Sequence, residues 1–319
     1  MLKSRSLAPF LTTAILCLCP AAIAAEAVDV PPVASGAPAP TQPRDDEPLF
    51  ASPTRLDRIG RIVAPVTING QGPFRLVVDT GASHTTLSPE LAARLGLEPE
   101  EHSVLMLNGV TGVEQVPAVR LERLEAGDLI LEKIPAPIVR SSIMAGADGI
   151  LGVAGLTHER ITVDFRRDRI SITRSRASDE TSGMLRIPAM RVTGGLLMVE
   201  ARVGGVKARA VIDTGAERTL GNAVLRDQLR LRKRIGQPNE ITTVFGTTSE
   251  VSSGEVQRVP TITLGGATIS QVNVVFGEFH IFKVWELDAV PTLLLGMDVL
   301  GTVHQLIIDY RRREVYVRT

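Results

Sequence analysis

The sequence predicts an all-β fold made of two duplicated, barrel-like lobes with a few short helices. Three observations support this prediction. Short apolar runs alternate with turn residues along most of the chain, and the pattern occurs twice. Hydrophobic residues make up 44% of the sequence but aromatic residues only 3%, so the cores must be aliphatic, which favours strands. Many short strands separated by turn signals are typical of barrels and sandwiches.

The first copy begins with a hairpin pattern. Residues 62–68 alternate as a strand, Asn69-Gly70 is a turn dipeptide, and residues 74–78 return as a second strand. This strand runs directly into an Asp-Thr-Gly-Ala sequence. A short helix is then predicted from Ser88, its N-terminal cap, to Gly96.

The second copy has the same order of features. Residues 196–203 form a predicted strand, Gly204-Gly205 a turn, and residues 206–212 a second strand. Another Asp-Thr-Gly-Ala sequence follows, and Asn222 is the predicted cap of a helix that ends near Leu229.

Each copy continues with an apolar run that ends in glycine and then with a closing hairpin pattern. The runs are residues 149–152 and 293–296, and the hairpins are residues 161–172 and 306–317. The motif aspartates lie 134 positions apart (213 − 79), whereas the run-ending glycines lie 144 apart (296 − 152). The second copy is therefore longer by about ten residues, and the chain is an internal duplication with unequal halves.

We expect the first lobe at residues 55–175, a polar linker at 176–189 and the second lobe at 190–319. Residues 26–54 are rich in Pro, Ala and acidic residues, which predicts a disordered linker. A pro-segment is the alternative interpretation of this stretch.

The first 25 residues have the pattern of a secretory signal peptide. Lys3 and Arg5 precede a short apolar run at residues 11–18, and Ala22-Ile23-Ala24 forms a small-residue cleavage site. The run is too short for a comfortable membrane span. We expect an exported protein, most simply a periplasmic one, because the excess of Arg over Lys is typical of GC-rich bacterial genomes.

Composition excludes several classes of function. The net charge is zero, which argues against nucleic-acid binding, and the basic runs 232–234 and 311–313 are expected to be solvated turns. Both cysteines, Cys17 and Cys19, lie in the signal segment, so the mature chain would have neither a disulfide nor a thiol nucleophile. The five scattered histidines show no ligand spacing, so we expect no metal site.

The two motif aspartates, Asp79 and Asp213, are the candidate catalytic residues. Two carboxylates held close together cannot both ionise cheaply, so they share one proton. The ionised member can take a proton from water while the protonated member polarises a carbonyl group. A single Asp-Thr-Gly triplet is common in turns, but two copies in the same frame predict a catalytic pair.

The residues beside each aspartate have predicted supporting roles. Gly81 and Gly215 allow a tight turn that directs backbone N–H groups at the acid. Thr80 and Thr214 each carry a hydroxyl that can hydrogen-bond across the seam between the lobes.

The sequences at 79–83, 149–152 and 161–165 resemble those of the retropepsin-like aspartic peptidases, in particular bacterial members. The clan includes retroviral proteases and pepsins, and the likeness covers residues 55–175 and 190–317. It implies a pseudo-twofold acid-protease fold, an aspartate dyad at the bottom of a cleft, and β-hairpin flaps over a peptide or protein substrate. It also implies catalysis without a metal or cofactor.

Carried over by position, the resemblance places one flap near Gly109, Val110 and Thr111 and the other near Phe245 and Gly246. Both motifs stand in one chain, unlike in the retroviral enzymes, so a monomer is expected to suffice. The disulfides and the flap tyrosine typical of pepsins are missing.

Two questions stay open from sequence. The second motif continues with Glu217-Arg218 where the first has Ser83-His84, so a charge near the dyad either alters its protonation or pairs outside the cleft. The predicted function is an aspartic endopeptidase, with a non-catalytic peptide-binding protein as the alternative.

A cluster of aromatic residues precedes the second apolar-glycine run. It either lines substrate subsites or covers an extra loop on the core. Its members are Phe276, Phe279, Phe282 and Trp285.

Overall fold

The computed structural model describes residues 52–53, 55–56, 60–99, 103–140, 144, 146–229 and 240–319. Within these ranges the structure is mostly β, with two sheets and four short α-helices, which confirms the predicted all-β fold with two lobes. The predicted signal peptide at 1–25 and nearly all of the predicted linker at 26–54 lie outside them. None of the helices described is long and apolar enough to cross a bilayer.

The first half of the chain builds an eight-stranded sheet. Its elements are β2 (Arg55–Leu56), β3 (Ile62–Ile68), β4 (Gln71–Val78), β5 (Thr86–Leu87), α1 (Pro89–Arg94), β6 (Val104–Asn108), β7 (Val113–Ala126), β8 (Leu129–Pro137) and β9 (Gly149–Leu151). The strand order is β5-β9-β4-β3-β7-β6, with β2 beside β3 and β8 beside β7. β4 and β9 are parallel neighbours, and β5 pairs with the far side of β9.

The remaining strands form a sheet of thirteen. The elements are β1 (Ser52–Pro53), β10 (Glu159–Asp164), β11 (Arg169–Arg174), β12 (Leu185–Arg191), the 3₁₀ turn η2 (Thr193–Gly195), β13 (Leu197–Val203), β14 (Val206–Ile212), β15 (Leu220–Gly221), α2 (Ala223–Leu229), β16 (Glu240–Phe245), β17 (Val251–Leu264), β18 (Ala267–Phe276), α3 (His280–Val284), β19 (Thr292–Leu295), α4 (Met297–Leu300), β20 (Gln305–Asp309) and β21 (Glu314–Arg318). Its order is β1-β11-β10-β20-β21-β12-β13-β14-β19-β15-β18-β17-β16. The second half repeats the arrangement of the first, because β14 is parallel to β19 and β15 pairs with β19.

Local sequence explains the turns that begin each copy. Asn69 and Gly70 both have positive φ (50° and 75°), as the tight turns that match the twist of a hairpin require. Gly204 and Gly205 do the same in the second half (52° and 90°). The predicted caps are also present, since the Leu91 N–H donates to Ser88 Oγ at 3.1 Å and the Leu225 N–H to Asn222 Oδ1 at 2.9 Å.

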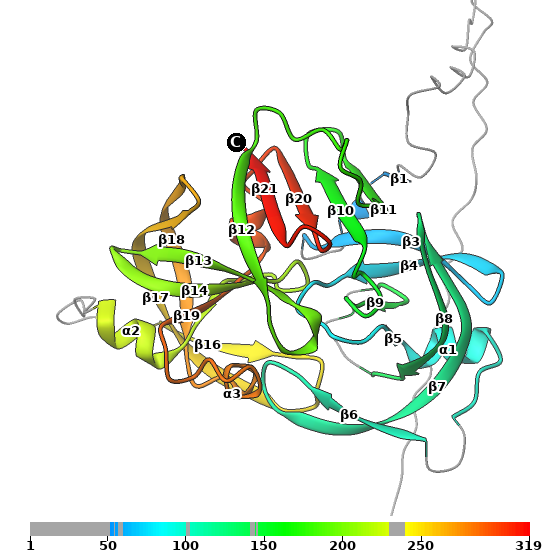
Figure 1. The fold of residues 1–319 in the computed structure, drawn as a ribbon. Helices are drawn as coiled ribbons and strands as arrows, with labels where there is room; N and C mark the ends of the chain where they lie inside the picture. Colours follow the sequence, from blue (N-terminus) through cyan, green and yellow to red (C-terminus); the bar gives the residue numbers. More distant parts are fainter. Residues whose placement is uncertain are drawn as a thin grey trace, which may run out of the picture. The chain divides into compact units, whose positions relative to one another are not determined.

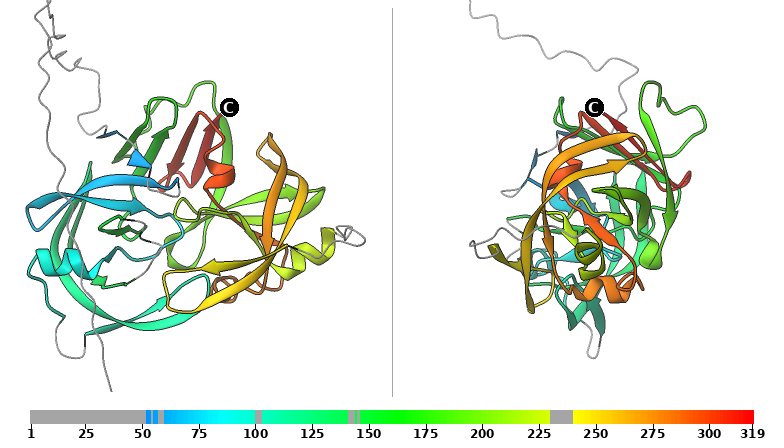
Figure 2. Two further views of the ribbon diagram at one scale, coloured as in Figure 1. Left: turned by 180° about the vertical axis from the view of Figure 1, so that it is seen from behind. Right: turned by 90° about the vertical axis from the view of Figure 1, so that its left-hand side faces the viewer.

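The two closing hairpins lie side by side near the top of Figure 1, where they join the two halves in what we call the central sheet. β10 of the first half pairs with β20 of the second, and Val163 lies opposite Leu306 in the register. Buried aliphatic side chains from both halves belong to one continuous core. On the side away from β20 and β21, the hairpins β6–β7 and β16–β17 reach toward each other, as the left view of Figure 2 shows.

The segment expected to be a linker, residues 176–189, ends in a strand. Residues 185–188 of β12 pair with β21, and residues 189–191 pair with β13, so the strand joins the central sheet to the second lobe. Sequence alone did not indicate this strand, because Pro188 interrupts it and a proline inside a run argues against a strand.

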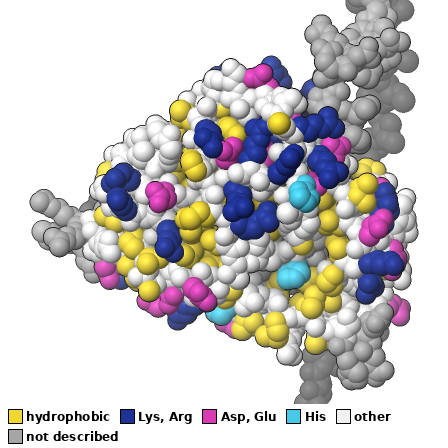
Figure 3. Space-filling model, in the orientation of Figure 1, with side chains coloured by type: hydrophobic (Ala, Val, Ile, Leu, Met, Phe, Trp, Pro, Cys, Tyr) yellow, Lys and Arg dark blue, Asp and Glu magenta, His cyan; other side chains and the backbone are white. Residues whose placement is uncertain are grey.

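Arginine side chains hold the rest of this linker. Arg312 donates to the carbonyl oxygens of Arg176 (2.6 Å) and Ala177 (3.0 Å), and Arg311 donates to that of Ser175 (2.7 Å). The run at 311–313 is a turn, as expected, but two of its side chains bind backbone instead of being simply solvated. Figure 3 shows Lys and Arg side chains gathered over this part of the molecule. The run at 232–234 lies outside the described residues.

Candidate active site

The two motif aspartates occupy equivalent positions at the ends of β4 and β14. The Asp79 N–H donates to the Leu151 carbonyl oxygen, and the Asp213 N–H donates to that of Leu295, both at 3.0 Å. Each aspartate is thus anchored to the parallel neighbour strand that ends in the apolar-glycine run. The duplicated sequence therefore places the two residues in duplicated local structure.

The threonines of the two motifs bond across the seam between the halves. The Thr80 hydroxyl donates to the Ile212 carbonyl oxygen at 2.7 Å, and the Thr214 hydroxyl donates to that of Val78 at 2.6 Å. Each threonine N–H also donates to the hydroxyl oxygen of the other, at 3.2 and 3.1 Å. The hydrogen bonds expected from the sequence are present, and all four groups are buried.

The glycines of the two motifs bring the carboxyl groups together. A methyl group added at Gly81 would overlap the Asp213 carboxyl, and one added at Gly215 would overlap the Asp79 carboxyl. Each glycine N–H also donates to the aspartate of its own motif at 2.8 Å. Only glycine permits this approach, so each loop packs directly against the acid of the other.

The two carboxyl groups are close enough to affect each other's ionisation. Each packs against the glycine of the other motif, and Asp213 is buried while Asp79 is half-buried. Burial raises the pKa of Asp79 above its ordinary value. Burial and then the charge of Asp79 raise the pKa of Asp213 well above its ordinary value. The pair holds one proton over a wide pH range because two adjacent charges in a buried site repel each other.

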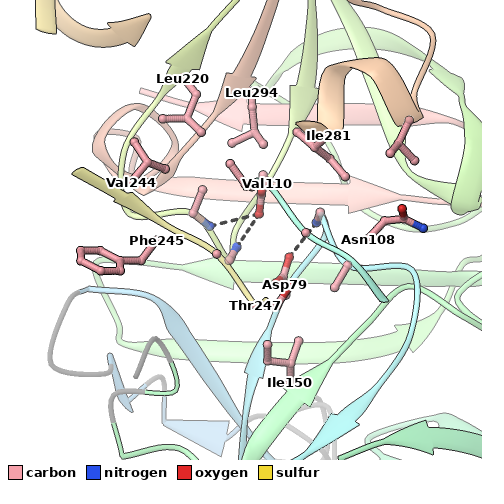
Figure 4. A pocket seen from close by; sticks show the side chains of 18 of the residues that line it. Asp79, Asn108, Val110, Ile150, Leu220, Val244, Phe245, Thr247, Ile281 and Leu294 are labelled. Carbon is pink, nitrogen blue, oxygen red and sulfur yellow. Dashed lines mark hydrogen bonds between the residues drawn. The ribbon is translucent and has the colours of Figure 1, made fainter. Parts of the chain in front are cut away.

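A cavity of about 570 Å³ opens onto the two carboxyl groups and is lined by both halves of the chain. Figure 4 shows Asp79 in the middle of this pocket, with Ile150 on one side in the view and Leu220 and Leu294 on the other. One pair of equivalent cavity positions differs in polarity: Thr86 in the first half corresponds to Leu220 in the second. The cavity is the size of a typical ligand site.

Two hairpin tips meet over the cavity. All five residues predicted for the flaps lie at these tips, and all except Thr111 line the cavity. Thr111 instead hydrogen-bonds to Thr248 of the other tip, with buried hydroxyl oxygens 3.0 Å apart. The Ser249 N–H donates to a Glu114 carboxylate oxygen at 2.7 Å. The tips therefore contact each other in a closed arrangement.

An aspartyl protease family model matches residues 64–154 and 199–299, one stretch in each half. The chain belongs to the aspartyl protease family. A search of curated proteins finds no match. The two matched stretches contain Asp79 and Asp213, so the internal duplication of this aspartyl protease chain coincides with two copies of the family domain.

Sequence reasoning did not single out two parts of the site in this aspartyl protease. Arg61 is 2% exposed and lines the cavity next to Asp79. Helix α3 lies against the β6 strand of the first flap, and the His280 ring bonds to Asn108 Oδ1 at 3.3 Å. Arg61 belongs to no motif. Only an alignment of the two copies would have drawn attention to it, because the equivalent residue of the second copy is the apolar Leu196.

The structure also places the charged pair after the second motif and the aromatic cluster, for which the sequence allowed two interpretations each. Glu217 and Arg218 are exposed and line the cavity, and none of the ion pairs found in the described ranges joins them. In the aromatic cluster, Trp285 lines the cavity. The three phenylalanines are buried in the core, so the cluster includes both roles that the sequence left open.

Proposed function

We propose that the protein is an aspartic endopeptidase that hydrolyses peptide bonds with a water molecule activated by Asp79 and Asp213. The observation that carries the proposal is the close approach of two carboxyl groups, one from each half, each packed against the glycine of the other motif beside a cavity of ligand size. Membership of the aspartyl protease family supports the same reaction class.

The chemistry follows from the shared proton. The ionised carboxylate takes a proton from water as the water oxygen attacks the carbonyl carbon, and the protonated carboxyl gives its proton to the carbonyl oxygen. The tetrahedral diol then collapses. The C–N bond breaks as the amine nitrogen takes a proton from the protonated carboxyl, and one diol hydroxyl gives its proton to the ionised carboxylate. The dyad again holds one proton, and the new carboxyl group leaves with the other fragment.

The substrate in this proposal is an extended peptide held between the dyad and the two flap tips. Extended peptides bind through backbone hydrogen bonds to strand edges, and β6 and β16 end the strand orders of the two sheets. Because both motifs stand in one chain, a monomer has both acids. The segment at 1–25 makes the periplasm the proposed location.

The test is cleavage of a mixed peptide library by the purified protein between pH 3 and 7. Wild type is compared with Asp79→Asn and Asp213→Asn, which keep the shape of each side chain but remove the acid. Each change should lower cleavage by roughly 10²–10⁴-fold, the usual contribution of acid–base catalysis.

The matched control is Asp168→Asn, an exposed aspartate in the turn between β10 and β11. This variant should cleave at the wild-type rate. Full activity in purified Asp213→Asn would refute the dyad. Tight peptide binding without cleavage, together with no inhibition by a statine, would support the peptide-binding alternative instead.

A further inference from the structure

The neighbour of Asp79 across the sheet is a buried cation. In the antiparallel pair β3–β4, Val63 lies opposite Val77. Arg61 and Asp79 lie just beyond these strands, and the same register continued by two residues would set them opposite each other on one side of the sheet. Arg61 is 2% exposed and lines the same cavity as Asp79.

The neighbour of Asp213 is apolar. In the equivalent pair β13–β14, Met198 lies opposite Val211. The same continuation by two residues would set Leu196 opposite Asp213, and Leu196 is fully buried. The two halves therefore differ at the one position that faces each acid across the sheet.

Backbone donors do not produce this difference. The Gly81 N–H donates to the Asp79 carboxylate and the Gly215 N–H to that of Asp213, both at 2.8 Å. The Ala216 N–H also donates to the Asp213 carboxylate at 3.1 Å, whereas the Ala82 N–H donates to the main-chain carbonyl oxygen of Asp79 at 3.4 Å. The backbone donors therefore do not favour ionisation of Asp79 over Asp213.

Other ionisable groups near the pair are also shared or exposed. The buried Tyr310 hydroxyl interacts electrostatically with both acids, and Arg191 lies near that hydroxyl. His84, Glu217 and Arg218 line the cavity but are exposed, so solvent screens them. Arg61 is the buried, permanently charged side chain among the cavity residues.

We propose that Arg61 is a positioning residue that keeps Asp79 ionised and so places the shared proton on Asp213. A cation close to one of two coupled acids stabilises the charge on that acid, and a leucine beside the other gives no such help. Within the proposed function, on which this inference rests, Asp79 is then the base that takes a proton from water and Asp213 is the acid.

Electrostatics support the assignment independently of the register. Burial is the largest influence on the pKa of Asp79 and raises it, while the contact with Asp213, the Gly81 N–H and then the charge of Arg61 lower it. Burial and then the charge of Asp79 raise the pKa of Asp213. Arg61 is thus the cation that acts on Asp79, in the direction that the proposal requires.

The first experiment needs no turnover. The aspartates are labelled with carbon-13 at the carboxyl, and Asp79 is titrated by NMR in the Asp213→Asn variant while Asp213 is titrated in Asp79→Asn. Each protein then has one carboxyl in the site. We expect the ionisation constant of Asp79 to exceed that of Asp213 at least tenfold, which is one pKa unit.

Arg61→Leu, which copies the residue of the other half, is then added to both backgrounds. It should lower the ionisation constant of Asp79 at least tenfold and change that of Asp213 by a smaller factor. Arg61→Lys should leave the ionisation constant of Asp79 close to its value with Arg61 in place. A lower pKa for Asp213 than for Asp79, or equal shifts in both, would overturn the assignment. If Arg61→Leu does not fold, the two single-carboxyl proteins with Arg61 in place still show which of the two acids has the lower pKa.

The second experiment is the pH profile of kcat/KM for a cleaved peptide. Removing the cation raises both pKa values of the pair. Arg61→Leu should therefore move both limbs of the profile to higher pH, whereas Arg61→Lys should stay close to wild type. An unchanged profile would count against Arg61. If no peptide is cleaved, the proposed function fails while the NMR titration still tests the role of Arg61.

Discussion

Each residue of the two motifs contributes to the other half of the molecule as well as to its own. Thr80 bonds to the backbone before Asp213, and Gly81 leaves room for the Asp213 carboxyl. The Asp-Thr-Gly-Ala sequences predicted these residues, because a tight turn and a hydroxyl donor have recognisable residue types. Arg61 could not be predicted in this way, since a single arginine before a strand has no characteristic spacing.

At the residue scale, the buried acid should reduce stability at neutral pH. The pKa of Asp213 is raised in the folded state above its ordinary value of 3.8, so the folded protein keeps a proton that the unfolded chain loses. The stabilisation is complete below about pH 3.8 and is lost as the pH rises through the folded-state pKa. Asp213→Asn has no ionisable group at this position, so its stability should not fall in this way as the pH rises.

The free energy of unfolding of Asp213→Asn should therefore exceed that of wild type at pH 7 more than at pH 4. The gain is about 1.4 kcal/mol for each unit by which the pKa is raised. Urea unfolding at the two pH values measures it, with Asp168→Asn as the control. A difference that is the same at both pH values would contradict the argument.

At the scale of elements, hairpins and helices that depend on local signals were predicted closely. Turn dipeptides fix the β3–β4 and β13–β14 hairpins, and caps fix the starts of α1 and α2. The strand β12 and the contact between the two flap tips were not predicted. Both depend on partners far along the chain, and a pattern of apolar residues does not identify the partner of a strand.

The closed flap tips should have to separate before a peptide can enter. Thr111 and Thr248 have hydroxyl oxygens 3.0 Å apart, so cysteines at both positions are placed to form a disulfide with small adjustments. The oxidised Thr111→Cys/Thr248→Cys protein should cleave peptides at least tenfold more slowly than wild type, and a reductant should restore the rate.

The matched controls are the two single-cysteine variants, each under oxidising and reducing conditions, in a protein without Cys17 and Cys19. Mass spectrometry reports whether the disulfide has formed. A fully cross-linked protein that cleaves at the wild-type rate would show that the tips need not part.

At the scale of the whole molecule, the duplication predicted two lobes but not the sheet that unites them. The strands of both closing hairpins were expected from their alternation, whereas their pairing through β10 and β20 was not. The linker is also more ordered than its polar sequence suggested. Its order comes from arginines distant in sequence, and these were expected to be solvated.

Arg312 should be important for the stability of this junction. Its guanidinium donates to the Arg176 and Ala177 carbonyl oxygens and lies 3.8 Å from a carboxylate oxygen of Asp309, which is fully buried. Arg312→Gln should lower the free energy of unfolding by about 1–3 kcal/mol, because the buried Asp309 carboxylate loses its neighbouring cation. It should also open a new protease-sensitive site between residues 176 and 184.

The comparison is Arg313→Gln, an exposed arginine in the same turn. Urea unfolding and limited proteolysis of both variants provide the measurement. Equal losses of stability in the two variants, with no new cleavage site in the linker, would mean that the linker is held by other contacts.

The strand order also sets when the site is completed during synthesis. Strands β20 and β21 follow all the others in the sequence, yet they lie between β10 and β12 in the central sheet. A growing chain has already produced Asp79 and Asp213 before the strands that join the two halves emerge. The two halves can therefore be joined through this sheet only after the last strands of the chain are present.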